Sequence, residues 1–343
     1  MSQSNAQAAV PAVITFVNFL LLLKLAPSCC ETIKKICSKN KLLAPHIIDF
    51  LKTRCVKKVI GAGGNGIIFL THQGCTIKIC FLSYHHTDYY KTADGDIRSK
   101  TLDKIIELGL TSLTGYEILV KEHYLVVHEY HSIQSYTLNE LLTNTSTSSF
   151  IKKCLVQLVN IVVKLRKERL MHNDIKAINI MLSMNMKRRR HNVSDASDED
   201  ENNFNMKFVD VISIDNIFRF SWEQTTPPYS VIYLGPSGNA IYMIFATMIS
   251  CLCHPLIYPQ LFHVGGLDVL PAFVKKFLNE SYDLQTLEQN LEILLGYKQS
   301  QEVIEMLVAL LYTIALNSCD SHPKKEEYVE FVARILPELK QFL

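Results

Sequence analysis

Four residues with chemically useful side chains fall close together in an otherwise largely apolar run: His172, Asp174, Lys176 and Asn179. A carboxylate can accept a proton from a hydroxyl, an ammonium can balance charge that develops on a phosphate, and an amide oxygen can hold a metal ion. The spacing of the last three therefore suits phosphoryl transfer to a hydroxyl. A polar turn between a helix and a strand would also fit, so this chemistry needs partners elsewhere in the chain.

A glycine-rich run supplies the first such partner. Gly61, Gly63 and Gly66 fit the pattern G-x-G-x-x-G, and the branched Ile68 follows two residues later. Glycines let the backbone approach phosphates closely, because no Cβ stands in the way. A dinucleotide-binding site would need a helix directly after the last glycine. Residues 67–71 are branched and apolar instead, so we expect a strand, a loop and a second strand.

Together with Lys78 and Asp210, these motifs resemble the protein-kinase superfamily. The catalytic loop of that family reads H-R-D-L-K-x-x-N, and residues 172–179 read H-N-D-I-K-A-I-N. Lys78 stands in a T-I-K-I sequence similar to the V-A-I-K strand, and Asp210 falls where the family has the Asp of D-F-G. The resemblance covers residues 56–343, and several elements in the family's order carry more weight than any single motif.

The resemblance implies a role for each residue. Asp174 would orient and deprotonate a Ser or Thr hydroxyl of a protein substrate, and Lys176 would steady the transferred γ-phosphoryl group. Asn179 and Asp210 would hold Mg²⁺, while Lys78 would align the phosphates of ATP. Lys176 also favours Ser or Thr over Tyr as the acceptor. The residues that would surround the nucleotide are Ile60, Gly61, Gly63, Gly66, Ile68, Lys78, Glu129 and Tyr130.

Periodicity predicts the elements that position these residues. Residues 92–110 read as a helix, from which Asp103 or Glu107 would pair with Lys78 by the same resemblance. Residues 150–170 have apolar side chains at helical intervals, and this helix would deliver the catalytic loop at its end. Further helices are expected over 137–142, 238–249, 291–297, 303–316 and 328–336, strands over 56–60, 75–81 and 206–212, and a hairpin over 116–121 and 123–128.

The expected fold class is α+β, with the two lobes of a protein-kinase-like fold. The small β-rich N-lobe would span residues 55–130 and the mainly helical C-lobe residues 131–343. Residues 1–54 would form an N-terminal extension, in which an apolar run at 8–23 precedes a basic helix. Residues 184–205 contain four basic residues followed by five acidic ones, a composition that cannot pack in a core. We therefore expect a disordered insertion there.

Composition narrows the partners and the compartment. The 343-residue chain has a net charge of +2, so nothing in its overall charge points to nucleic acid, and no direct nucleic-acid binding is expected. Ten cysteines without zinc-ligand spacing suit a reducing, intracellular compartment, the cytoplasm or the nucleus. The run at 8–23 is shorter than the roughly 20 residues that span a bilayer, so a membrane anchor is not favoured. ATP and protein substrates are the expected partners.

Departures from the family's pattern keep two other functions open. H-N-D at residues 172–174 also resembles small-molecule phosphotransferases such as choline and aminoglycoside kinases, although these generally lack a lysine at the position of Lys176. Val211 and Ile212 follow Asp210 in place of Phe and Gly, and no A-P-E motif is recognisable. These features suit a pseudokinase that acts as a binding or scaffold module. Such divergence resembles kinases of large DNA viruses or parasites.

Two of the departures affect regulation. The family's Arg at the position of Asn173 pairs with a phosphorylated activation loop, so control by such phosphorylation is not expected here. Isoleucine adopts a positive φ only at a cost, and Ile212 stands where the family has a glycine. We therefore expect that Asp210 does not swing readily in and out of the site.

Overall fold

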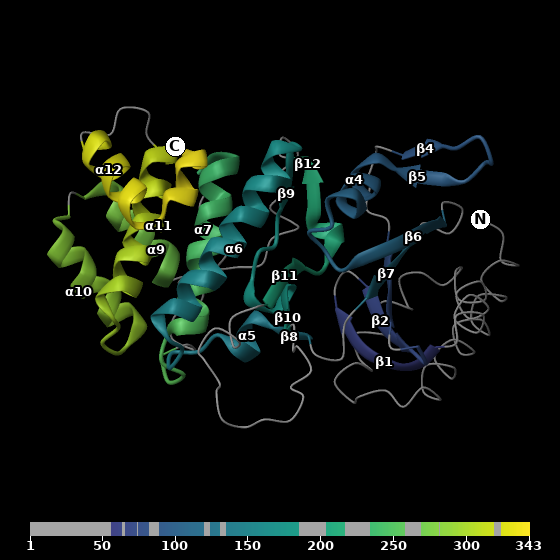
Figure 1. Cartoon of the computed structure of the whole chain (residues 1–343), viewed down its shortest axis with the longest axis horizontal. Helices are drawn as coiled ribbons and strands as arrows, with labels where there is room; N and C mark the ends of the chain where they lie inside the picture. The colour runs from purple at the N-terminus through teal and green to yellow at the C-terminus, as the bar shows by residue number, and fades with distance from the viewer. Residues whose placement is uncertain are drawn as a thin grey trace, which may run out of the picture. The chain divides into compact units, whose positions relative to one another are not determined.

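The chain has a mixed α+β fold with small antiparallel sheets and several helices. The structure is a computed structural model that describes residues 56–63, 66–73, 75–81, 89–119, 124–130, 135–184, 204–216, 234–257, 269–280, 282–318 and 324–343. The fold divides into two compact units, residues 1–134 and 135–343, and each is considered by itself (Figure 1).

The first unit is built on a five-stranded antiparallel sheet with the strand order β1-β2-β3-β7-β6. One face of this sheet is apolar and buried across neighbouring strands: Val59 lies opposite Phe69, Phe69 lies opposite Ile77, and all three are buried. The predicted strands and the predicted hairpin are confirmed, with bounds β1 Val56–Gly63, β2 Gly66–Thr71, β3 Cys75–Phe81, β6 Leu113–Leu119 and β7 Tyr124–Tyr130.

The helix predicted over 92–110 is shorter than expected. Only α4 (Lys100–Leu108) is helical, and β4 (Tyr89–Lys91) and β5 (Ile97–Ser99) form a hairpin before it. Gly95 adopts a φ of +89° in the turn of this hairpin. Ser99 then caps α4 by accepting a hydrogen bond from the backbone N–H of Leu102. The apolar residues keep a helical spacing through this region, but the turn at Gly95 and the cap at Ser99 make the helix begin only at Lys100.

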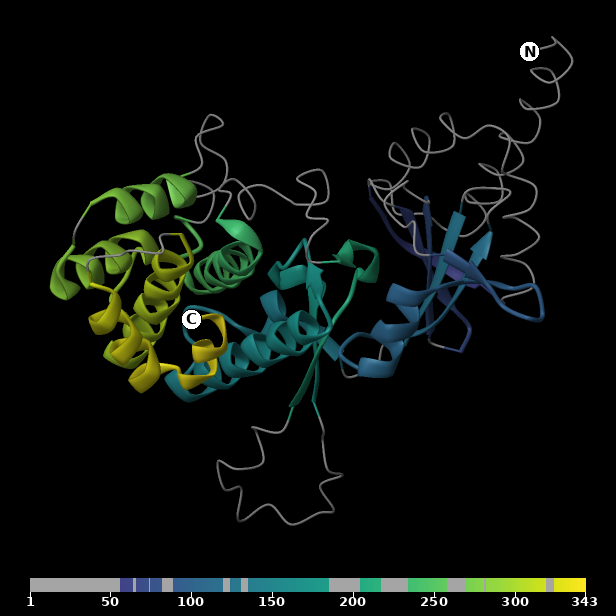
Figure 2. The same ribbon diagram turned by 90° about the horizontal axis from the view of Figure 1, so that it is seen from above.

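The second unit is centred on three neighbouring helices: α6 (Ser148–Lys167), α7 (Gly235–Leu252) and α11 (Gln301–Ser318) (Figures 1 and 2). Thr147 caps α6 by accepting from the N–H of Phe150. The apolar positions predicted for α6 are confirmed as buried, so its inner face follows the 3.6-residue period. They are Ile151, Leu155, Leu158, Val159, Val162 and Leu165.

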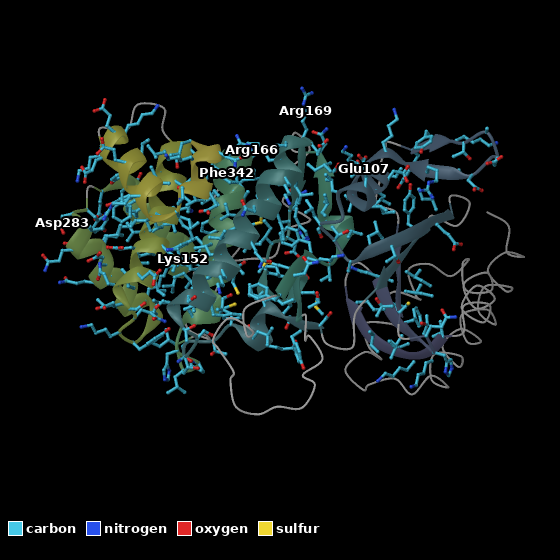
Figure 3. All side chains as sticks on the ribbon, viewed as in Figure 1. Glu107, Lys152, Arg166, Arg169, Asp283 and Phe342 are labelled. Carbon is cyan, nitrogen blue, oxygen red and sulfur yellow. The ribbon has the colours of Figure 1, made fainter. Side chains whose placement is uncertain are left out.

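The remaining helices surround this centre. Short α5 (Leu138–Leu141) and α12 (Lys325–Ile335) fall where helices were predicted. Helix α10 (Leu284–Leu295) begins seven residues before the helix predicted over 291–297. Helix α9 (Val269–Asn279) was not predicted, because Pro271 in its first turn interrupts the apolar pattern without breaking the helix. At the C-terminal 3₁₀ turn, Arg166 of α6 donates to the carbonyl of Gln341 and lies over the ring of Phe342 (Figure 3).

A three-stranded sheet with the order β11-β10-β8 supports one side of α6: β8 (Ser135–Thr137), β10 (Ile180–Met184) and β11 (Phe204–Phe208). The insertion predicted over 184–205 is narrower than expected, because Met184 pairs with Phe204. Phe204 and Met206 point into the core and extend the strand. The strand predicted over 206–212 also ends earlier, at Phe208.

Several expectations lie outside the described residues. These are the N-terminal extension with its apolar run at 8–23 and the charged residues 185–203. Among the helices that the structure describes, none is both long and apolar enough to cross a bilayer. Cys75, Cys154, Cys251 and Cys253 are free thiols. Burial raises the pKa of Cys154 and of Cys251 to about 12, which keeps these two thiols protonated and unreactive.

Candidate functional site

The carboxylate of Asp174 is held by two neighbours from its own loop. Its Oδ2 lies 2.6 Å from the Nζ of Lys176 and accepts a hydrogen bond of 2.9 Å from the Nδ2 of Asn179. The same Nδ2 donates to the backbone carbonyl of Asp174 at 2.9 Å. Oδ1 is buried and has no hydrogen-bond partner in the described part of the chain. Asp174 is only 4% exposed, so its carboxylate has one oxygen fixed by two neighbours and one buried oxygen without a hydrogen-bond partner among the described residues.

His172 connects this loop to the strand that leads to Asp210. The Nδ1 of His172 accepts from the backbone N–H of Asp174 at 3.1 Å, so the ring proton stands on Nε2. Nε2 then donates to the carbonyl of Val209, also at 3.1 Å. Burial lowers the pKa of His172, and its bond to Val209 only partly offsets this effect. A neutral imidazole therefore acts as a fixed spacer between the two segments.

Backbone hydrogen bonds reinforce the same connection. The N–H of Val209 donates to the carbonyl of Asn179 at 2.9 Å, and the N–H of Asn173 donates to the carbonyl of Ser213 at 2.8 Å. Strand β9 (Leu170–His172) also pairs with β12 (Ile214–Asn216). The chain is therefore hydrogen-bonded to the loop both before Asp210, at Val209, and after it, at Ser213. The loop with His172 and the segment that contains Asp210 form one assembly.

Asp210 adopts a left-handed backbone conformation, with a φ of +59°. The residues after it, Val211–Ser213, form a 3₁₀ turn (η4) in which Ile212 needs no positive φ. Aspartate tolerates the left-handed region better than a branched residue does, because its short polar side chain can bond locally. The left-handed residue of this segment is thus Asp210 itself, so isoleucine at position 212 is compatible with the turn.

Two supporting side chains were missed by sequence reasoning. Thr247, fully buried in α7, donates from Oγ1 to the carbonyl of Ile175 at 3.2 Å. Gln157 of α6 bridges the free edge of β11, because its Nε2 donates to the carbonyl of Phe204 and its Oε1 accepts from the N–H of Met206, both at 3.2 Å. A single polar residue within an apolar helical face was the only available signal for either.

In the first unit, the register of the sheet aligns three of the predicted nucleotide-contacting residues. Gly61 lies opposite Ile68, Ile68 lies opposite Lys78, and Lys78 lies opposite Val127. Directly opposed residues of antiparallel strands face the same side of a sheet, so Ile68 and Lys78 share one face. Lys78 is buried there.

The other predicted nucleotide contacts lie at the ends of these strands. Gly63 pairs with Gly66 at the end of the β1–β2 hairpin, which confirms the strand–loop–strand arrangement. Ile60 stands in an irregular stretch of β1 and is exposed. Glu129 and Tyr130 end β7, opposite Thr76 and Cys75.

The two acidic residues predicted as alternative partners of Lys78 have different surroundings. The carboxylate of Asp103 accepts from the hydroxyls of Tyr90 and Tyr116, at 2.8 Å each, and pairs with Arg98. Burial raises the pKa of Asp103, but these bonds outweigh burial and lower it overall. Glu107 bonds Lys104 at the surface of α4 (Figure 3). The network around Asp103 fixes α4 to the β4–β5 hairpin.

Asn179 and Asp210 have side-chain oxygens that could bind a metal ion. Mg²⁺ is usually bound by one or two carboxylates together with water and substrate phosphates. Asn179 directs its Nδ2 at Asp174, which leaves its amide oxygen for a cation, and Asp210 offers a carboxylate. Among the described residues, no group of three or more His, Cys, Asp or Glu side chains could hold a metal ion by itself. The residue types therefore fit Mg²⁺ held jointly with phosphates.

The predicted site residues thus form two sets. His172, Asp174, Lys176 and Asn179 are in direct contact within the second unit, and Val209 connects them to Asp210. Gly61, Ile68 and Lys78 form a row in the first unit. No model of a known protein family matches the chain, and no curated protein is similar to it in sequence.

Proposed function

We propose that this protein transfers the γ-phosphoryl group of ATP to Ser or Thr hydroxyls of protein substrates. The orientation of the Asp174 carboxylate is the observation that carries the proposal. Lys176 and Asn179 occupy its Oδ2, while Oδ1 has no hydrogen-bond partner among the described residues. Oδ1 is itself buried, so an incoming hydroxyl would reach it only after the atoms that cover it move, and it could then accept the hydroxyl proton without displacing a hydrogen bond from the described residues.

The reaction assigns a balanced role to each group. The acceptor oxygen forms a bond to the γ-phosphorus, the bond from that phosphorus to the β,γ-bridging oxygen breaks, and ADP leaves. Asp174 takes the hydroxyl proton, and Lys176 balances charge on the transferred group. Mg²⁺ would neutralise the charge that develops on the phosphate oxygens. Asn179 and Asp210 are its proposed ligands.

The two units would have the separate roles of the two lobes of a protein-kinase-like fold, nucleotide binding in the first unit and the acceptor and metal residues in the second. The row from Gly61 through Ile68 to Lys78 supports a nucleotide-binding role for the first unit, because it places a buried lysine two strands away from a glycine of the G-x-G-x-x-G pattern. Ile60, Gly63 and Gly66 would complete the phosphate loop, with Glu129 and Tyr130 near the base. The second unit would supply the acceptor and metal residues.

Hydrogen bonds among the described residues hold the loop to the segment that follows Asp210, which suits a loop that does not depend on phosphorylation. Asn173 stands where the kinases that the chain resembles have an arginine, and its backbone N–H bonds the carbonyl of Ser213. His172 and the β9–β12 pairing supply the remaining connections. We therefore propose that the catalytic loop is assembled constitutively.

A pseudokinase function is the second candidate, and the burial of Asp174 favours it. A carboxylate that is 4% exposed is less accessible to a protein hydroxyl than an open catalytic base would be. A binding module would retain the internal bonds of the loop for stability alone. The kinase and the pseudokinase would have the same fold, but only the kinase would transfer a phosphoryl group.

Nucleotide binding and acceptor choice test the proposal together. Mg-ATP should raise the melting temperature of the wild type, and Lys78→Met should show no such rise relative to its own unliganded melting temperature. Transfer of labelled phosphate to proteins supports the kinase. Binding of ATP without transfer supports the pseudokinase, and transfer only to choline-like or aminoglycoside-like metabolites would replace the protein substrate by a small molecule.

A further inference from the structure

Thr247 is a fully buried threonine of α7 whose hydroxyl bonds outside its own helix. A threonine in a helix commonly satisfies its hydroxyl by donating to the carbonyl three or four residues earlier in the same helix. The equally buried Thr313 of α11 does so, because its Oγ1 donates to the carbonyl of Ala309 at 2.8 Å. The Oγ1 of Thr247 instead donates to the carbonyl of Ile175 at 3.2 Å, across 72 residues of sequence. The Thr247 hydroxyl therefore links α7 to the loop.

Ile175 lies between the candidate base and the lysine that is paired with it. Asp174 precedes it and Lys176 follows it, and the Nζ of Lys176 is 2.6 Å from the Oδ2 of Asp174. The carbonyl of Ile175 belongs to the planar peptide group that ends at the nitrogen of Lys176, so a bond to this carbonyl restricts the direction in which Lys176 continues. The side chain of Ile175 is also fully buried. Ile175 is therefore anchored through its side chain and through its carbonyl.

The carbonyls on either side of Ile175 are held from within the loop. The carbonyl of Asp174 accepts from the Nδ2 of Asn179, and the carbonyl of Lys176 accepts from the backbone N–H of Asn179, both at 2.9 Å. These two bonds shape the loop internally. The bond from Thr247 has a different effect, because it ties the loop to one of the three central helices of the second unit.

We propose that Thr247 is a positioning residue for phosphoryl transfer: it holds the carbonyl of Ile175 so that Asp174 and Lys176 keep their relative orientation. This inference rests on the proposed function and adds a residue to the same site. Thr247 is fully buried, so it acts through Ile175 and does not itself touch a substrate. Transfer is sensitive to such placement, since a shift of about 1 Å in a reacting group can cost about 100-fold in rate.

A matched pair of valine variants tests this role. Valine has nearly the shape of threonine without the hydroxyl, so Thr247→Val and Thr313→Val each remove one hydroxyl bond from a buried helix position. Initial rates with labelled ATP at varied concentration and mixed protein substrates give kcat and the KM for ATP. Thr247→Val should lower kcat by about 3- to 30-fold and change the KM for ATP by less than about 2-fold. Thr313→Val should equal the wild type, and so should Thr247→Ser, which keeps the hydroxyl.

The outcomes separate positioning from stability and from the function on which it rests. An unchanged kcat in folded Thr247→Val, or a change confined to the KM for ATP, refutes the role of Thr247 and leaves the kinase standing. An equal fall of kcat in Thr313→Val refutes it as well, because the loss would then follow from core stability. A loss in Thr247→Ser as large as in Thr247→Val refutes the role of the hydroxyl. If Thr247→Val does not fold, Thr247→Ala should show the same loss relative to Thr313→Ala. Labelling by the wild type that does not exceed that by Asp174→Asn refutes the proposed function, and this inference with it.

Discussion

Replacing His172 by phenylalanine tests the physical account of the loop most specifically. The ring keeps a similar shape and can still pack against Phe208, whose centroid lies 4.6 Å from that of His172. The change removes both imidazole bonds, and it leaves the N–H of Asp174 and the carbonyl of Val209 without these partners. His172 is 1% exposed, so water cannot readily replace either bond.

The expected loss of stability follows from these two groups. Each buried backbone group that loses its partner costs about 1–3 kcal/mol, so the two groups together should lower the free energy of unfolding of His172→Phe by about 2–6 kcal/mol. Urea denaturation followed by circular dichroism measures this quantity. If the slope of the unfolding free energy against urea concentration is the same in the variant and the wild type, the folded state is otherwise retained. A loss below about 0.5 kcal/mol would refute the bridging role, because changes of that size are ordinary for surface positions.

Three further predictions concern the same assembly. Burial lowers the pKa of His172, so the unfolded chain binds this proton first as the pH falls below the ordinary value of 6.5. The wild type should therefore lose stability below that pH, and His172→Phe should show a smaller slope in the same urea titrations. Thr247→Val removes one bond to the carbonyl of Ile175 and should cost about 1 kcal/mol by urea denaturation; no loss would contradict a role for that bond. Gln157→Leu removes both bonds to the edge of β11 and should cost about 1–2 kcal/mol, with faster amide exchange at Met206; unchanged exchange would contradict the bridge.

Helix α6 and the strands of the first unit follow closely from the sequence. Apolar residues of α6 recur with the helical period, and each predicted core position is buried. The helix over 92–110 was too long, because the period alone does not reveal that Gly95 turns the chain and that Ser99 starts a new helix. Short-range capping decides such boundaries, and the apolar pattern runs across them.

The candidate site was only partly accessible from the sequence. Residues 172–179 could be singled out because their contacts are local, between positions at most five apart. The bridge from His172 to Val209 spans 37 residues, and the bridge from Gln157 to Phe204 spans 47. Such contacts depend on how distant elements pack, which no local pattern records. The left-handed backbone at Asp210 was likewise not predictable, because no pattern in the neighbouring residues indicates a positive φ there.

The rate of phosphoryl transfer in Asp174→Asn tests the central claim most directly. The amide keeps the size of the carboxylate and the possible contact with Lys176, but it cannot accept the hydroxyl proton. Labelled ATP, Mg²⁺ and mixed protein substrates are incubated with the wild type, with Asp174→Asn and with Ile293→Glu. Ile293→Glu is the surface control, because Ile293 on α10 is 73% exposed. The account predicts that Asp174→Asn is slower than the wild type by about 10²- to 10⁴-fold, while Ile293→Glu equals the wild type. Equal rates for the wild type and a folded Asp174→Asn would contradict it.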